Sequence, residues 1–121
     1  MNTYRERLEG LLLEVNNCYM QLQTNQREYF EASELALKAK EKLEVKKVMS
    51  LYDGTITGKN TDEREGAART IFPELFVAYG EAHDKELGAK FLLDSSIVTV
   101  ELSRARLRIF ELLVKGLENN G

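Results

Sequence analysis

The stretch DGTITGKN, residues 53–60, decides the fold because it separates two long regions that are both typical of helix. Gly54 and Gly58, with the β-branched threonines between and beside them, interrupt helical periodicity, and we expect one of the two glycines to adopt a positive φ. Asn60 and Glu63 then form a capping box for the next helix, which also begins with carboxylates favoured by the helix dipole.

No glycine or proline occurs between residues 11 and 51, so nothing breaks a helix there. We therefore expect a helix over about residues 3–51, a turn over about 52–61 and a helical arm over about 61–117. The three parts would form a single helical domain covering residues 1–121, because a chain of this length has room for one core.

Apolar residues in both arms recur at spacings of three and four, the pattern of a coiled coil. In the first arm we assign this stripe to Leu8, Leu12, Val15, Tyr19 and Leu22. The second arm should be kinked near Arg69–Phe72 by Pro73, or broken into two helices near Gly80.

The two arms should pack as a long antiparallel hairpin, an all-α fold with Leu8–Leu22 beside Ile97–Val114. The segment 97–117 is apolar on more than one side, more than a single partner helix can cover. We therefore expect a helical bundle completed by self-association, as a homodimer or a higher oligomer. Ile109, Phe110 and Leu113 are the expected contacts with the partner.

The composition excludes several classes of protein. The net charge of −3 gives no general attraction to nucleic acid or to anionic lipid, and a single cysteine cannot form an internal disulfide. The apolar run Leu11–Leu13 is too short for a signal peptide or a membrane helix, so we expect a cytoplasmic protein that makes no membrane contact.

Residues that carry chemistry are sparse. Residues 54–61 are similar to a phosphate-binding loop but have the wrong glycine spacing, Asn60 in place of Ser or Thr, and a helix where a strand should precede. His83 is the only histidine and has no Glu-x-x-His partner, since Gly80 stands three residues before it. We therefore expect neither an enzyme nor a metal or cofactor site.

Two other groups of residues suggest binding. Basic side chains near the turn could contact phosphate, although a solvated helix face is the simpler interpretation and no aromatic residue interrupts the lysine run to stack on bases. Phe72 and Phe76 flank Pro73 and could form a local exposed anchor for a protein partner. The candidate phosphate contacts are Lys38, Lys42, Lys46, Lys47, Lys59 and Arg64.

The pattern G-x-I-x-G-K-N-x-x-x-R, residues 54–64, lies between two long charged helices and resembles small uncharacterised helical-hairpin proteins of phages and prophages of Gram-positive bacteria. The resemblance implies an accessory, anti-host or anti-defence role through protein contacts and implies no activity. We therefore expect a non-catalytic interaction or assembly protein that binds itself and, on this resemblance, a host or defence protein. The alternative is a nucleic-acid-associated protein that uses the basic end at residues 38–47.

Overall fold

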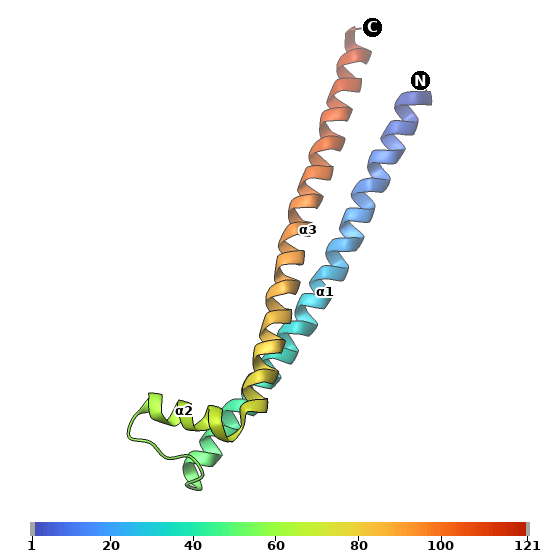
Figure 1. The fold of residues 1–121 in the computed structure, drawn as a ribbon. Helices are drawn as coiled ribbons and strands as arrows, with labels where there is room; N and C mark the ends of the chain where they lie inside the picture. The colour runs from blue at the N-terminus through green and yellow to red at the C-terminus, as the bar shows by residue number, and fades with distance from the viewer. Residues whose placement is uncertain (1, 121) are drawn as a thin grey trace. The chain divides into compact units, whose positions relative to one another are not determined.

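The computed structural model describes residues 2–120 and contains three helices in the order α1 (Asn2–Tyr52), α2 (Thr61–Ile71) and α3 (Pro73–Asn120), as Figure 1 shows. Within this range 92% of the residues are helical and none belongs to a strand. The predicted all-α class is therefore confirmed.

The second arm is broken at Phe72, the residue between α2 and α3. Its backbone leaves the helical region (φ −134°, ψ 68°), while its N–H still donates to the carbonyl of Ala68 at 3.0 Å. Pro73 is then the first residue of α3, a position where the missing N–H costs little and the fixed φ suits a helix.

The alternative break near Gly80 was wrong, because α3 continues through Gly80 and Gly88. Glycine in a helix interior costs about 1 kcal/mol but keeps its backbone N–H, so it weakens a helix without ending it. Proline removes the N–H, and the break falls beside it.

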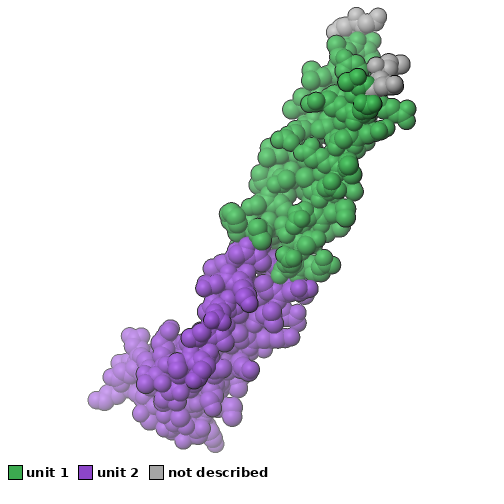
Figure 2. All heavy atoms as spheres, turned by 45° about the vertical axis from the view of Figure 1, so that its right-hand side comes forward, with its two compact units in different colours: residues 1–28, 90–121 green, residues 29–89 purple. Residues whose placement is uncertain are grey.

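The chain divides into two compact units, drawn in green and purple in Figure 2. In the described chain, unit 1 consists of residues 2–28 and 90–120, and unit 2 consists of residues 29–89. Helices α1 and α3 contribute to both units, whereas α2 belongs to unit 2 alone.

In unit 1 the beginning of α1 runs antiparallel to the end of α3, so the first turn of α1 and the last turn of α3 lie at the same end of this unit (Figure 1). Three contacts define the register. The Asn25 side chain donates to the Leu92 carbonyl at 3.2 Å, Arg106 Nη1 lies 2.9 Å from Glu14 Oε1, and the ring centroids of Tyr4 and Phe110 are 6.5 Å apart. This register matches the predicted pairing of residues 8–22 with residues 97–114.

Unit 2 is held together by a small apolar core at the junction of its helices. Leu43 of α1, Ile56 of the turn, Ala68 of α2 and Phe72 are all buried. Partly buried side chains of α2 and α3 pack around them, namely Ala67, Leu75, Phe76 and Tyr79.

Candidate interaction surfaces

The turn between α1 and α2 is shaped by the residues of the G-x-I-x-G pattern. Gly54 has φ 81°, which confirms the predicted positive φ. The Ile56 side chain is 3% exposed, and its N–H donates to the Ser50 carbonyl at 3.0 Å. A Cβ at Gly58 would lie 2.9 Å from the backbone N of Arg64, so this position has room only for glycine.

The remaining residues of the pattern begin helix α2. Asn60 Oδ1 accepts from the N–H of Glu63 at 2.9 Å, which confirms the predicted N-cap. Glu63 Oε2 accepts from the N–H of Lys59 at 2.7 Å, and Arg64 Nε donates to the Gly58 carbonyl at 3.2 Å. The pattern at residues 54–64 is thus a set of turn and capping residues.

Asp53 at the end of α1 adds a further local bond to this turn. Its Oδ1 accepts from the N–H of Thr55 at 2.9 Å. Hydrogen bonds from the side chain of Thr55, and then from its backbone, lower the pKa of the exposed Asp53 carboxyl. A slight desolvation opposes this lowering, and the positive charge of Lys46 adds to it.

The four candidate phosphate contacts on α1 do not all lie on one side of the helix. At 100° per residue, Lys38, Lys42 and Lys46 fall within an arc of about 80°, whereas Lys47 lies roughly opposite Lys38. The first three are exposed, and Lys38 Nζ is 3.5 Å from Glu34 Oε1. Three of the four lysines therefore share one side of the helix.

Lys47 instead belongs to the structure of unit 2. Its side chain is 18% exposed, and its Nζ lies 2.9 Å from Glu65 of α2 and 3.4 Å from Glu44. Burial lowers the pKa of Lys47, but its hydrogen bonds and charge interactions with Glu65 and Glu44 outweigh burial and hold the pKa above 10.5. The ammonium is thus engaged between α1 and α2, which makes the prediction of a phosphate contact here a poor fit.

The aromatic pair beside Pro73 is divided between the core and the surface. Phe72 is 5% exposed, so the expectation of an exposed anchor was wrong for this residue. The break before Pro73 brings Phe72 into the core of unit 2, an effect that helical spacing does not reveal. Phe76 is half-buried: its ring stacks on Phe72, with centroids 6.1 Å apart, and lies 5.2 Å from Lys47 Nζ and 4.5 Å from Arg69 Cζ.

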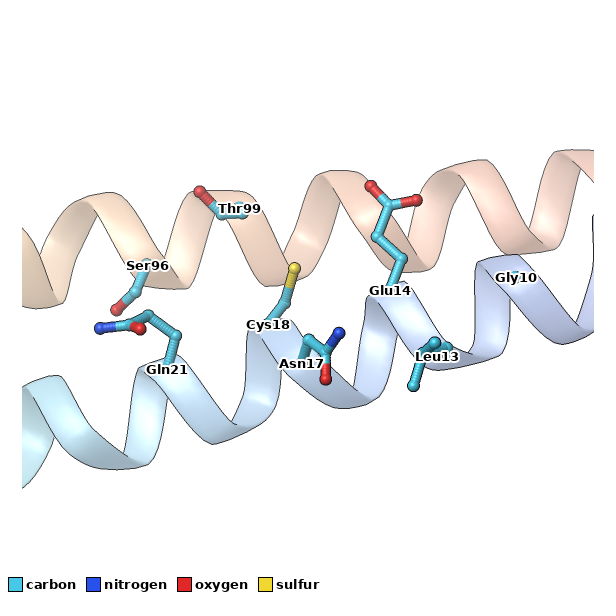
Figure 3. A pocket seen from close by; sticks show the side chains of 8 residues that line it. All are labelled: Gly10, Leu13, Glu14, Asn17, Cys18, Gln21, Ser96 and Thr99. Atoms are coloured by element: carbon cyan, nitrogen blue, oxygen red, sulfur yellow. The ribbon is translucent and has the colours of Figure 1, made fainter.

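An open groove runs along unit 1 between α1 and α3 (Figure 3). Cys18 is half-buried, and its thiol points from α1 toward α3, where Ser96 and Thr99 line the groove. Glu14 also reaches toward α3, where it pairs with Arg106. These side chains are engaged in packing and pairing between the two helices.

His83 lies in unit 2, where Nδ1 is 3.5 Å from Glu86 Oε1 and the ring meets Tyr79 edge to face. Among residues 2–120, no group of three or more His, Cys, Asp or Glu side chains is arranged to hold a metal ion. None of the described helices has a stretch long and apolar enough to cross a bilayer.

The seam between α1 and α3 in unit 1 combines apolar and polar residues. Leu8, Val15 and Leu22 of the predicted stripe are partly buried, as are Leu107 and Val114 of α3. On α1 the inward positions include Leu11 and Cys18, while Leu12 and Tyr19, which were expected in the stripe, are 49% and 39% exposed. On α3 the buried positions include Ser96 and Ser103 as well as Val100. Both serines donate to carbonyls of their own helix, at 2.8 and 2.9 Å.

Large apolar side chains of α3 instead face outward. Val98, Leu102, Ile109 and Leu112 are 53%, 58%, 58% and 62% exposed. With Ala105, which is also exposed, positions 98, 102, 105, 109 and 112 follow one another at alternating spacings of four and three residues. The outward face of α3 therefore carries a second coiled-coil repeat.

The three expected partner contacts of α3 differ in exposure. Ile109 and Leu113 are 58% and 63% exposed, so both can contact a partner. Phe110 is half-buried against Tyr4, with the guanidinium of Arg7 5.8 Å from its ring centre. Phe110 therefore serves the packing of unit 1 itself.

No protein-family model, curated protein or solved structure matches this chain. The residues and surfaces described above are therefore the basis on which a function can be proposed.

Proposed function

We propose that this protein is a non-catalytic helical interaction or assembly protein that associates with copies of itself. The observation that supports it is the outward face of α3, where Val98, Leu102, Ile109 and Leu112 are each more than half exposed. Contiguous apolar surface of this kind is typical of protein interfaces.

Burial of these four side chains in an interface would contribute a free energy that is large for a small protein. Complete burial of one large aliphatic side chain is worth about 1.5–3 kcal/mol. With roughly half of each side chain already covered, burial of the four would still contribute about 3–6 kcal/mol. The seam between α1 and α3 cannot take them up, because they lie on the opposite side of α3.

Sedimentation velocity over a range of protein concentrations tests self-association. We expect a dimer or larger species at about tens of micromolar, dissociating on dilution. The double variant Leu102→Asp/Ile109→Asp should be monomeric and still helical by circular dichroism, because both side chains are exposed. A folded monomer of the natural chain at these concentrations would refute self-association.

We also propose, on the resemblance of the turn at residues 54–64, an accessory or anti-host role in a phage or prophage of a Gram-positive bacterium. Capture of a specific host protein by the natural chain, reduced by substitutions on the exposed apolar surface but not by substitutions of exposed polar residues, would support it. Equal capture by both kinds of variant would count against the role.

The nucleic-acid alternative is supported by Lys38, Lys42 and Lys46, which share one side of α1. It predicts binding to duplex DNA or RNA that weakens steeply between about 50 and 200 mM salt. The double variant Lys42→Glu/Lys46→Glu should abolish such binding, with Lys85→Glu/Lys90→Glu as the control at exposed lysines of α3. Binding that is absent at low salt would exclude the alternative.

A further inference from the structure

The outward repeat of α3 has the length and spacing of a coiled-coil interface. It comprises Phe91, Val98, Leu102, Ala105, Ile109 and Leu112, with Ser95 completing the spacing of four and three. All of these residues belong to unit 1 and are exposed; Phe91 is 69% exposed. On an α-helix such positions form one continuous stripe, at about 160° from the seam that faces α1.

A row of charged residues flanks this stripe along one edge. Asp94, Glu101, Arg108 and Lys115 follow at intervals of seven, and all four are exposed. The sign changes in the middle of the row, from two acidic residues to two basic ones. In an antiparallel pair of identical helices this edge faces itself, so the acidic half of one copy meets the basic half of the other.

The register of such a pair follows from the spacing. If Glu101 lies opposite Arg108 of a second copy, Asp94 lies opposite Lys115, and each pair occurs twice about a twofold axis. In the same register Leu102 packs beside Ala105 of the second copy, and Val98 packs beside Ile109. Charge pairing and apolar packing are therefore satisfied together.

A parallel pair fits less well. Parallel helices would bring Asp94, Glu101 and Arg108 toward the other edge of the stripe in the second copy, formed by Thr99, Arg106 and Leu113. Only Arg106 could form an ion pair there, and it already lies 2.9 Å from Glu14 of its own chain. The antiparallel arrangement gives four ion pairs from otherwise exposed groups.

We propose that two copies of this chain dimerise through the outward face of α3, antiparallel, with Glu101 opposite Arg108 of the second copy and Asp94 opposite Lys115. The proposal rests on the proposed self-association and specifies its surface, direction and register.

Charge exchange tests the register. Glu101→Arg alone and Arg108→Glu alone each replace two attractive pairs of the homodimer with two repulsive ones. Each should raise the dimer dissociation constant about tenfold. Mixing the two variants restores both attractive pairs, so the mixture should form a heterodimer in preference to either homodimer and about as tightly as the natural chain.

Native mass spectrometry or sedimentation of the two variants, one carrying a mass tag, measures this preference. The matched control is Arg104→Glu mixed with Glu111→Arg, which are exposed residues of the same helix beside the seam rather than beside the stripe. The control mixture should give the statistical proportion of heterodimer. Circular dichroism establishes that each variant is folded.

Cysteine cross-linking provides a second measurement. In a Cys18→Ser background, a mixture of Leu102→Cys and Ala105→Cys should give a disulfide-linked heterodimer on mild oxidation, whereas Leu102→Cys mixed with Ile97→Cys should not. A natural chain that is monomeric would refute the proposed self-association itself. A dimeric natural chain with statistical mixing of the charge variants and no cross-link would refute this interface and leave self-association standing.

Discussion

The glycines of unit 2 allow a prediction in which one kind of substitution has opposite effects at different positions. Gly54→Ala and Gly58→Ala in the turn should destabilise the protein, and Gly80→Ala in α3 should stabilise it. The three sites differ in backbone conformation and in the space around a new Cβ, and both are given by the structure.

At Gly54 the φ of 81° lies in the left-handed region, and a new Cβ would have no neighbouring atom within 4 Å. The cost is therefore that of the backbone conformation alone, about 1 kcal/mol. At Gly58 the new Cβ would lie 2.9 Å from the N of Arg64 and 3.0 Å from Cβ of Glu63. Because those atoms belong to the first turn of α2, the helix start must move, and we expect a cost of about 1–3 kcal/mol.

At Gly80 the backbone is helical and nothing lies within 4 Å of a new Cβ. Alanine there should raise the free energy of unfolding by about 0.5–1 kcal/mol, because it reduces the freedom of the unfolded chain. Urea unfolding followed by circular dichroism, at one fixed protein concentration, measures all three. A Gly58→Ala variant as stable as the natural chain, or a destabilising Gly80→Ala, would refute the reasoning.

Three further predictions concern unit 2. Phe72→Ala should lower the free energy of unfolding by about 3–5 kcal/mol because the ring is buried. The control Phe30→Ala, at a side chain that is 70% exposed, should change it by less than about 0.5 kcal/mol, and equal effects would contradict the assignment of Phe72 to the core. Asn60→Ala should cost about 1 kcal/mol by removing the cap on Glu63 N, and Asn60→Ser should restore most of the loss in the same urea assay. Burial lowers the pKa of Lys47, but Glu65 and Glu44 raise it above 10.5 overall, so its ion pairs stabilise the fold below pH 10.5 and are lost as the pH rises through the higher folded-state pKa. The free energy of unfolding should therefore fall more in this alkaline range for the natural chain than for Lys47→Met. Parallel pH profiles of the two proteins would exclude this role of Lys47.

The turn could be predicted from the sequence because its determinants are local. A positive φ at Gly54, the N-cap at Asn60 and the break beside Pro73 each depend on the covalent chemistry of one residue and its nearest neighbours. The same locality explains the error at Gly80. A glycine weakens a helix without ending it, and packing of the rest of α3 decides the outcome.

The seam of unit 1 could be predicted only in part, because it depends on contacts distant in sequence. Leu11 and Leu12 fit a spacing of three and four equally well and are the same residue type, so the local sequence does not separate them. Between Cys18 and Tyr19, a search for large apolar residues favours the exposed tyrosine. Two inward positions of α3 were also hidden, since Ser96 and Ser103 carry no apolar signal. The burial of Phe72 likewise depends on the direction of the chain after the break.

The repeat that forms the outward stripe of α3 is present in the sequence, although its direction is not. Val98, Leu102, Ala105, Ile109 and Leu112 repeat at four and three, and the charged row from Asp94 to Lys115 repeats at seven beside them. The apolar excess of this segment is evident from its composition, but its separation into two repeats is not. That separation requires knowing which positions face α1.

The two faces of α3 differ in how they can define a partner. In the seam, the hydroxyls of Ser96 and Ser103 donate within their own helix, so their hydrogen bonds place no demand on α1. The contacts from Asn25 to Leu92 and from Glu14 to Arg106 do cross the seam, and they hold its register. The outward face offers larger apolar side chains and a charge row that is complementary to itself. On the proposed interface, pairing of two copies would therefore add apolar burial to that of the seam and would stabilise the folded chain by mass action.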